Sequence, residues 1–150
     1  MTCIAWDGTT LAADKRATNS GGLARTCTKI ERFADKLLAM TGDWDEAIET
    51  REWFKAGADP AKFPESVRKG DRSSLLVIDA VGNIWHYTKG PYPMEVEDKQ
   101  MAWGSGRDFA LAAMHLGKDA IYAVEVACVF QTDCGSGIDA LELDVKGEPF

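Results

Sequence analysis

The sequence has little of what marks metal sites, membrane spans or nucleic-acid binding. It contains two histidines and four cysteines, and no two cysteines form a Cys-x-x-Cys pair, which disfavours a zinc site. No apolar run approaches the roughly 20 residues of a membrane-spanning helix. The net charge is −7 and the 17 Lys and Arg residues are scattered, so a basic stripe for nucleic acid is missing. We expect no cofactor, no metal, no nucleic-acid partner and no membrane partner.

The first residues also lack the features of a secretory signal, namely a basic start followed by an apolar core of roughly 7 to 15 residues. We therefore expect a cytoplasmic protein. In that compartment single cysteines usually stay reduced and serve as small buried apolar groups, although an even number of them also permits two disulfides. The residues concerned are Cys3, Cys27, Cys128 and Cys134.

Length and composition are those of one soluble globular domain. The chain has 150 residues, of which 45% are hydrophobic and 27% charged. At this length about two-thirds of the surface of the unfolded chain can be buried. Residues 1–150 are therefore expected to form a single domain.

The pattern of apolar residues predicts strands, one helix, more strands, two helices and a last strand. The predicted strands cover residues 2–6, 9–14, 24–31, 36–40, 74–79, 83–87, 101–103 and 138–145. The first helix follows Asp43, a plausible N-cap with Glu46 at capping-box spacing. The other two lie between Gly106 and Gly117 and over residues 119–131. Residues 57–71 are interpreted as a surface connection with room for a short helical turn.

The first two strands are expected to form a hairpin with a two-residue type I′ turn at Asp7-Gly8. Both strands are apolar without alternation, which indicates that both of their faces are covered. The order of elements then favours an α+β fold in which two antiparallel sheets lie between helical layers.

Thr2 is the first candidate for chemistry. If Met1 is removed, Thr2 carries both a hydroxyl and a free α-amine, and this pair can act as a nucleophile and its own base. An α-amine has an ordinary pKa of about 7.7 to 8.0, which suits a general base at neutral pH. Taken alone, Thr2 is merely the residue after the initiator.

Further motifs resemble those of proteasome β-subunits and occur in the same order. Thr-Cys-Ile-Ala-Trp at residues 2–6, followed by Leu-Ala-Ala-Asp-Lys-Arg-Ala-Thr at 11–18, is similar to the opening of those subunits. The later matches are Thr28-Lys29-Ile30, Ala39-Met40-Thr41-Gly42, Gly104-Ser105-Gly106 and Asp133-Cys134-Gly135-Ser136-Gly137. The resemblance covers nearly the whole chain. It implies the four-layer αββα sandwich of the N-terminal nucleophile hydrolases and a threonine endopeptidase activity.

The resemblance also implies a role for each matched residue. Thr2 would be the nucleophile, and Lys29, held by Asp14, would favour loss of its proton. The Gly42 amide would donate to the oxyanion of the tetrahedral intermediate. Three further residues would orient the amine and position the proton shuttle, namely Ser105, Asp133 and Ser136.

Structural alternatives exist for these residues. Asp14 and Lys29 are equally compatible with an ion pair at a strand edge, Gly42 with a turn residue, and Ser105 and Ser136 with caps. A one-residue shift in the comparison would transfer the role of Gly42 to Asp43.

Partners follow from the family rather than from any residue pattern. The resemblance implies a homo-oligomeric ring that acts on peptides or unfolded proteins. The compact bacterial ring protease of this family, closer in length, works with a separate ATP-driven unfoldase, so a partner of that kind is one the resemblance allows. Two alternatives stay open: a non-catalytic or assembly subunit that retains Met1, and a small-molecule amidase of the N-terminal nucleophile class.

Overall fold

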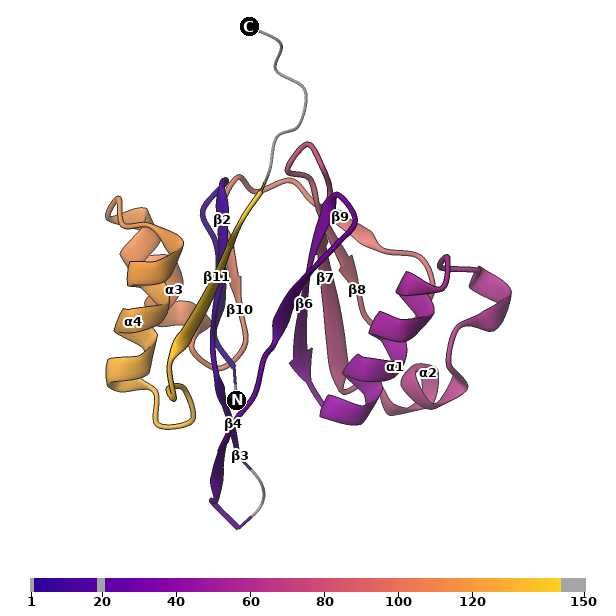
Figure 1. Cartoon of the computed structure of the whole chain (residues 1–150), viewed down its shortest axis with the longest axis horizontal. Helices are drawn as coiled ribbons and strands as arrows, with labels where there is room; N and C mark the ends of the chain where they lie inside the picture. The colour runs from indigo at the N-terminus through magenta and orange to yellow at the C-terminus, as the bar shows by residue number, and fades with distance from the viewer. Residues whose placement is uncertain (1, 19–20, 144–150) are drawn as a thin grey trace, which may run out of the picture. The chain divides into compact units, whose positions relative to one another are not determined.

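The computed structural model describes residues 2–18 and 21–143. The chain forms two compact units, one built from residues up to Glu31 and from Asp98 to Leu143, the other from Arg32 to Glu97. Each unit contains a sheet with helices packed against it (Figure 1). The predicted α+β class with antiparallel sheets is therefore confirmed. Among the described residues, no helix combines the length and apolar character needed to cross a membrane.

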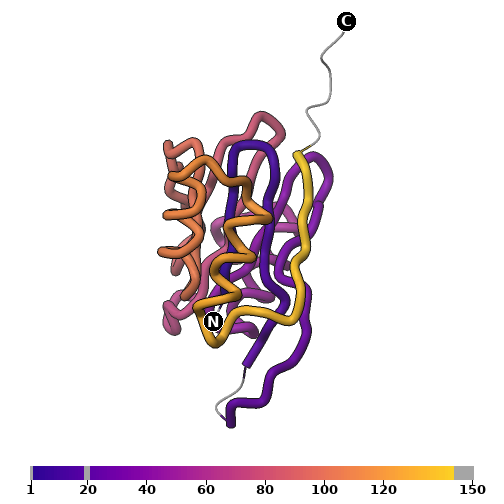
Figure 2. The backbone as a smooth tube through the Cα atoms, turned by 90° about the vertical axis from the view of Figure 1, so that its left-hand side faces the viewer, coloured from indigo at the N-terminus to yellow at the C-terminus, as the bar shows by residue number. Residues whose placement is uncertain are grey.

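The first unit is organised around a four-stranded antiparallel sheet in the order β10-β1-β2-β11. Its strands are β1 (Ile4–Trp6), β2 (Thr10–Asp14), β10 (Met101–Trp103) and β11 (Ile138–Glu142). The last strand of the chain thus pairs with the second (Figure 2). All four strands were predicted. The predicted end of β11 at residues 144–145 lies outside the described residues.

The β1–β2 hairpin is confirmed, but its predicted turn type is wrong. Gly8 has a φ of +105° and is the one residue of positions 7–10 with positive φ, whereas a type I′ turn requires two. The Asp7 carboxylate accepts hydrogen bonds from the backbone N–H groups of Thr9 and Thr10 at 2.9 and 2.8 Å. Asp7 therefore precedes the central residues of the turn instead of being one of them.

The prediction of one strand over residues 24–31 is also wrong. Strand β4 (Ala24–Thr26) pairs with β3 (Arg16–Thr18) in a small separate sheet, and β5 (Ile30–Phe33) joins another. Lys29 lies in the link between β4 and β5. Strand β3 was not predicted, because the residues of β3 and β4 are partly or fully exposed and form no apolar face that a sequence pattern would show.

Two helices cover the sheet of the first unit. They are α3 (Arg107–His115) and α4 (Ala120–Phe130), both predicted, and they contact each other and strands β1 and β2. The shared core is rich in small side chains, among them Ala5 and Ala12 from the strands and Ala110, Ala123 and Ala127 from the helices. Small side chains on both surfaces allow the helices to approach the sheet closely.

The second unit contains a five-stranded sheet in the order β5-β6-β7-β8-β9. Besides β5, its strands are β6 (Lys36–Gly42), β7 (Ser73–Ile78), β8 (Ile84–Tyr87) and β9 (Met94–Val96). Its helical elements are α1 (Trp44–Lys55), a 3₁₀ turn (Pro60–Lys62) and α2 (Glu65–Gly70). Only the first of these helices was clearly expected, and strand β9 was missed.

The predicted N-cap of α1 is confirmed, because the Asp43 side chain accepts a hydrogen bond from the Glu46 N–H at 3.0 Å. The capping box is not completed. The buried Glu46 carboxylate binds Arg72, accepting from its Nε at 3.0 Å and from its backbone N–H at 3.4 Å. The buried Glu46 carboxylate therefore pairs with a charged side chain instead of the backbone N–H of its own helix cap.

Candidate active site

Thr2 is fixed by the turn between β10 and α3. Its carbonyl oxygen accepts a hydrogen bond from the Gly106 N–H at 3.1 Å, and its side chain is nearly buried. Gly104 has a φ of +93°, and a β-carbon there would overlap the carbonyl oxygen of Thr2. A β-carbon at Gly106 would lie 2.8 Å from the β-carbon of Cys3. Both glycines are therefore needed for close contact with the start of β1.

Three predicted residues, Thr2, Ser105 and Asp133, form a chain of hydrogen bonds. The Thr2 backbone nitrogen, an amide in the full chain, donates to Ser105 Oγ at 3.2 Å. Ser105 Oγ lies 3.0 Å from Asp133 Oδ1 and 3.4 Å from the Thr2 carbonyl oxygen. The single hydroxyl hydrogen serves one acceptor at a time, and the shorter contact to a charged carboxylate is the stronger. The direction of donation is thus from Thr2 through Ser105 to Asp133.

The Asp133 carboxylate is held in its charged form. Partial burial acts against ionisation, but side-chain hydrogen bonds from Gln131 and Ser105 outweigh it, and the pKa of Asp133 lies below its ordinary value. The charged Asp133 carboxylate therefore accepts the hydroxyl hydrogen of Ser105. This leaves a lone pair of Ser105 Oγ free to accept from the Thr2 nitrogen.

Asp14 and Lys29 form a buried ion pair. Lys29 Nζ lies 2.8 Å from Asp14 Oδ1, and the two side chains are 2% and 0% exposed. The same Oδ1 accepts from the Cys3 N–H at 2.9 Å, whereas Oδ2 accepts from the N–H groups of Arg16 at 3.2 Å and Gly135 at 3.0 Å. Asp14 thus links Lys29 to the residue that follows Thr2. The pair is thus shielded from solvent, unlike an ion pair at the surface. The catalytic role of Asp14 and Lys29 stays a prediction.

Ser136, predicted to orient the Thr2 amine, forms its side-chain hydrogen bond with Arg16. Its Oγ accepts a hydrogen bond from Arg16 Nε at 3.2 Å, and its backbone has a φ of +64°. The orientation of the amine by Ser136 stays a prediction. Arg16 lies in the Leu-Ala-Ala-Asp-Lys-Arg-Ala-Thr motif, but the sequence predicts no role for it.

Gly42 ends strand β6 of the second unit and is paired in register with Ser73. Its φ is +85°, and a β-carbon would overlap the carbonyl oxygen of Arg72. The neighbouring Asp43 N–H donates to that same carbonyl at 2.7 Å, so the Asp43 amide is already used within its own unit. The oxyanion role of Gly42 stays a prediction.

The four cysteines are free thiols, of which Cys3 and Cys134 are buried. Burial is the main cause that raises the pKa of Cys134 to about 11, and it also raises the pKa of Cys3. A protonated thiol is a weak nucleophile, so burial disfavours Cys3 and Cys134 as nucleophiles. Within residues 2–18 and 21–143, no three His, Cys, Asp or Glu side chains form a group that could hold a metal ion.

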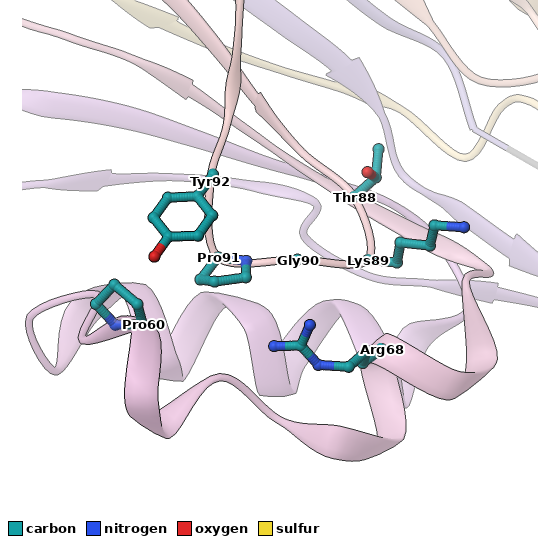
Figure 3. Close-up of a pocket in the computed structure, with 7 residues that line it drawn as sticks. All are labelled: Pro60, Arg68, Thr88, Lys89, Gly90, Pro91 and Tyr92. Atoms are coloured by element: carbon teal, nitrogen blue, oxygen red, sulfur yellow. The ribbon is translucent and has the colours of Figure 1, made fainter.

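A pocket of about 680 Å³ lies in the second unit and contains none of the predicted site residues (Figure 3). Its charged residues are Arg68 and Lys89, each 3.7 Å from a carboxylate, of Glu65 and Asp71 respectively. These cations are exposed and already paired. The candidate site is therefore the Thr2 region of the first unit.

Comparison with known proteins supports the same assignment of fold. No protein-family model and no curated protein sequence matches the chain. Among solved structures it is similar to BPH of Thiobacillus denitrificans in complex with epoxomicin, with 21% identity over 95% of this chain and 99% of that chain and a TM-score of 0.71. HslV from Trypanosoma brucei gives 19% identity over 95% and 98% of the two chains and a TM-score of 0.72. A second structure of Thiobacillus denitrificans BPH gives 21%, 95% and 97%, with a TM-score of 0.67.

The chain has the fold of these proteins. The predicted resemblance to proteasome-related hydrolases is therefore confirmed at the level of the fold, over nearly the whole chain. At 19–21% identity this likeness concerns the fold.

The contact between Gly104 and Thr2 can be tested with a matched control. Gly104→Ala is expected to reduce the unfolding free energy more than Gly117→Ala, because both positions have positive φ but a β-carbon at Gly117 meets nothing within 4 Å. The left-handed conformation alone costs an alanine about 1 kcal/mol. Urea unfolding of both variants measures the difference, and equal losses would contradict the proposed packing of Gly104 on Thr2.

Proposed function

We propose that this chain is a threonine-type peptidase subunit in which Thr2, exposed by removal of Met1, is the nucleophile. The observation that carries the proposal is the hydrogen-bond chain from the Thr2 nitrogen through Ser105 to Asp133. After removal of Met1 that nitrogen would be an α-amine, already held by Ser105. Met1 itself lies outside the described residues. In this proposal residues 1–150 form one hydrolase domain.

The reaction would proceed through an ester intermediate. Thr2 Oγ1 would attack the peptide carbonyl while its proton passes to the α-amine. The oxyanion would be stabilised by the Gly42 amide. Collapse of the tetrahedral intermediate would break the C–N bond, with the proton delivered to the leaving amine. Water, activated by the same α-amine, would then hydrolyse the ester and restore the Thr2 hydroxyl.

Lys29 and Asp14 would contribute through charge and position. A buried ammonium beside the start of β1 favours loss of a proton from a nearby hydroxyl. Asp14 compensates that charge and at the same time binds the Cys3 N–H. In this proposal the Asp133 carboxylate is linked to the Thr2 nitrogen through Ser105, and the Lys29 ammonium is linked to the Cys3 N–H through Asp14.

Epoxomicin is the probe suggested by the structural comparison, because it occupies BPH of Thiobacillus denitrificans. We expect it to raise the melting temperature of the processed protein, since a ligand that binds only the folded state stabilises it. The intact mass of the sample shows whether Met1 is gone. No shift with a fully processed protein, together with no hydrolysis of fluorogenic peptides, would refute the peptidase proposal and favour a small-molecule amidase. A fully retained Met1 would favour the non-catalytic or assembly subunit.

Assembly into a homo-oligomeric ring is part of the proposal, and an exposed apolar surface supports it. The surface is formed by the outer sides of α3 and α4 and is called the α3–α4 face. Large apolar side chains there are strongly exposed, among them Leu116 at 77%, Val129 at 75% and Phe130 at 66%. The Phe109 and Phe130 rings stack with centroids 5.5 Å apart. Large exposed apolar side chains that gather on one surface often mark an interaction surface.

Phe130→Glu is therefore expected to lower the oligomer mass measured by light scattering, because a charge in a buried apolar contact is unfavourable. The matched control is Val81→Glu, which places the same charge at a residue that is 79% exposed in the β7–β8 turn. Equal masses for the two variants would remove the α3–α4 face from the assembly. A separate ATP-driven unfoldase is a further partner that the family resemblance allows.

A further inference from the structure

Arg16 connects the first strands of the chain to the segment that contains Asp133 and Ser136, here called the 132–136 segment. It begins β3, directly after the Asp14-Lys15 pair. Its Nε donates to Ser136 Oγ at 3.2 Å, and its Nη1 donates to the Thr132 carbonyl oxygen at 3.0 Å. One guanidinium therefore holds both ends of the 132–136 segment, with Asp133 between them.

The close approach of Arg16 depends on Gly135. A β-carbon at Gly135 would lie 2.8 Å from Arg16 Nη2. The Gly135 N–H also donates to Asp14 Oδ2 at 3.0 Å, and its carbonyl accepts from the Lys15 N–H at 2.9 Å. The segment is thus fixed at Gly135 by the Asp14 carboxylate and the Lys15 N–H, whereas its two ends are fixed by the Arg16 side chain.

Ser136 adds a further reason why this contact matters. A non-glycine residue at a φ of +64° has an unfavourable backbone conformation that persists only where surrounding contacts hold it. The contact that the Ser136 side chain makes is with Arg16. Without the guanidinium, the segment is expected to relax at the end that follows Asp133.

We infer that Arg16 is a positioning residue for the proposed reaction, holding the 132–136 segment so that the Asp133 carboxylate stays hydrogen-bonded to Ser105. The inference rests on the proposed function for its catalytic consequence. Among the described residues, the two acceptors of the guanidinium are a hydroxyl and a backbone carbonyl, so the side chain acts through directed donors as well as through its charge. Arginine is suited to this because its rigid fork reaches two acceptors at once, which a lysine ammonium on a flexible stem does not.

The test compares Arg16→Met and Arg16→Lys with the control Lys15→Met. Lys15 is the adjacent cation, and its ammonium binds Asp139 at 2.7 Å and Thr28 at 3.1 Å, neither of which belongs to the 132–136 segment. The first readout is the pKa of the Asp133 carboxyl, followed by NMR titration of the full chain. The hydrogen bond from Ser105 lowers this pKa, so loosening the segment is expected to raise it.

Both Arg16 variants are expected to raise the Asp133 pKa, and Lys15→Met is expected to leave it unchanged. A rise in Arg16→Met but not in Arg16→Lys would show an effect of charge alone and would overturn the inference. An unchanged Asp133 pKa in both Arg16 variants would overturn it as well. This readout needs no catalytic activity, so it also decides the inference if the wild-type protein proves inactive.

The second readout is peptide hydrolysis. We expect kcat to fall about tenfold or more in both Arg16 variants with little change in KM, because misplacement of a proton-transfer group slows the chemical step. Lys15→Met should stay within about twofold of wild type, because the partly exposed ion pair that it removes, with Asp139, does not hold the 132–136 segment. A raised KM with unchanged kcat would instead assign Arg16 to substrate binding and refute a positioning role. Failure of the wild-type protein to hydrolyse any peptide, with the pKa shifts present, would refute the proposed function alone.

Discussion

Thr2→Ala is expected to abolish peptide hydrolysis while leaving the oligomer mass and the unfolding free energy close to those of wild type. The contacts that fix this residue are made by its backbone, namely the N–H bond to Ser105 and the carbonyl bond from Gly106. An alanine keeps both. The substitution therefore removes the proposed nucleophile and little else, and the loss in kcat should be at least about 10⁴-fold, as for other hydrolases without their nucleophile.

The matched variant is Thr2→Ser, which keeps a hydroxyl and an α-amine on the same residue. It should retain measurable hydrolysis of the same fluorogenic peptides, although a less constrained hydroxyl is expected to react more slowly. Each protein is compared after the mass of its amino-terminal peptide has established that Met1 is absent. Undiminished hydrolysis by processed Thr2→Ala would rule out Thr2 as the nucleophile.

Features that depend on neighbouring residues could be predicted from sequence. The N-cap at Asp43, the β1–β2 hairpin and helices α3 and α4 follow from local patterns of apolar residues, glycines and capping side chains. The same holds for the Gly104-Ser105-Gly106 turn, whose glycines indicate close backbone contact although not with which residue.

Features that depend on distant partners could not be predicted. Strand β3 has no buried residue, so no periodic pattern marks it. The Glu46 carboxylate was assigned to a local cap because its partner, Arg72, is far along the chain. Arg16 was missed for the same reason, since its acceptors Thr132 and Ser136 lie more than a hundred residues away. A sequence motif can indicate a reactive residue, but it does not indicate which distant side chain holds that residue in position.

The Asp14–Lys29 pair is where such long-range contacts should have the largest effect on stability. Lys29→Met is expected to lower the unfolding free energy by about 3–5 kcal/mol, the usual consequence of leaving a buried charge without its partner. The Asp14 carboxylate, 0% exposed, would keep its three backbone donors, from Cys3, Arg16 and Gly135, but lose the opposite charge.

A surface pair supplies the control for this prediction. Lys36 Nζ lies 2.9 Å from Asp35 Oδ1, nearly the same distance as in the buried pair, but the side chains are 36% and 51% exposed. Lys36→Met should therefore cost no more than about 1 kcal/mol. Denaturant unfolding of the two variants separates burial from distance as the source of the effect. An equally small loss of unfolding free energy in Lys29→Met and Lys36→Met would mean that the buried pair contributes no more to stability than a surface contact. It would contradict the view that Asp14 stabilises the fold by linking Lys29 to the start of β1. If Lys29→Met loses much stability but its folded fraction still hydrolyses peptides, Lys29 has a structural role only, because the proposed mechanism requires its charge beside Thr2.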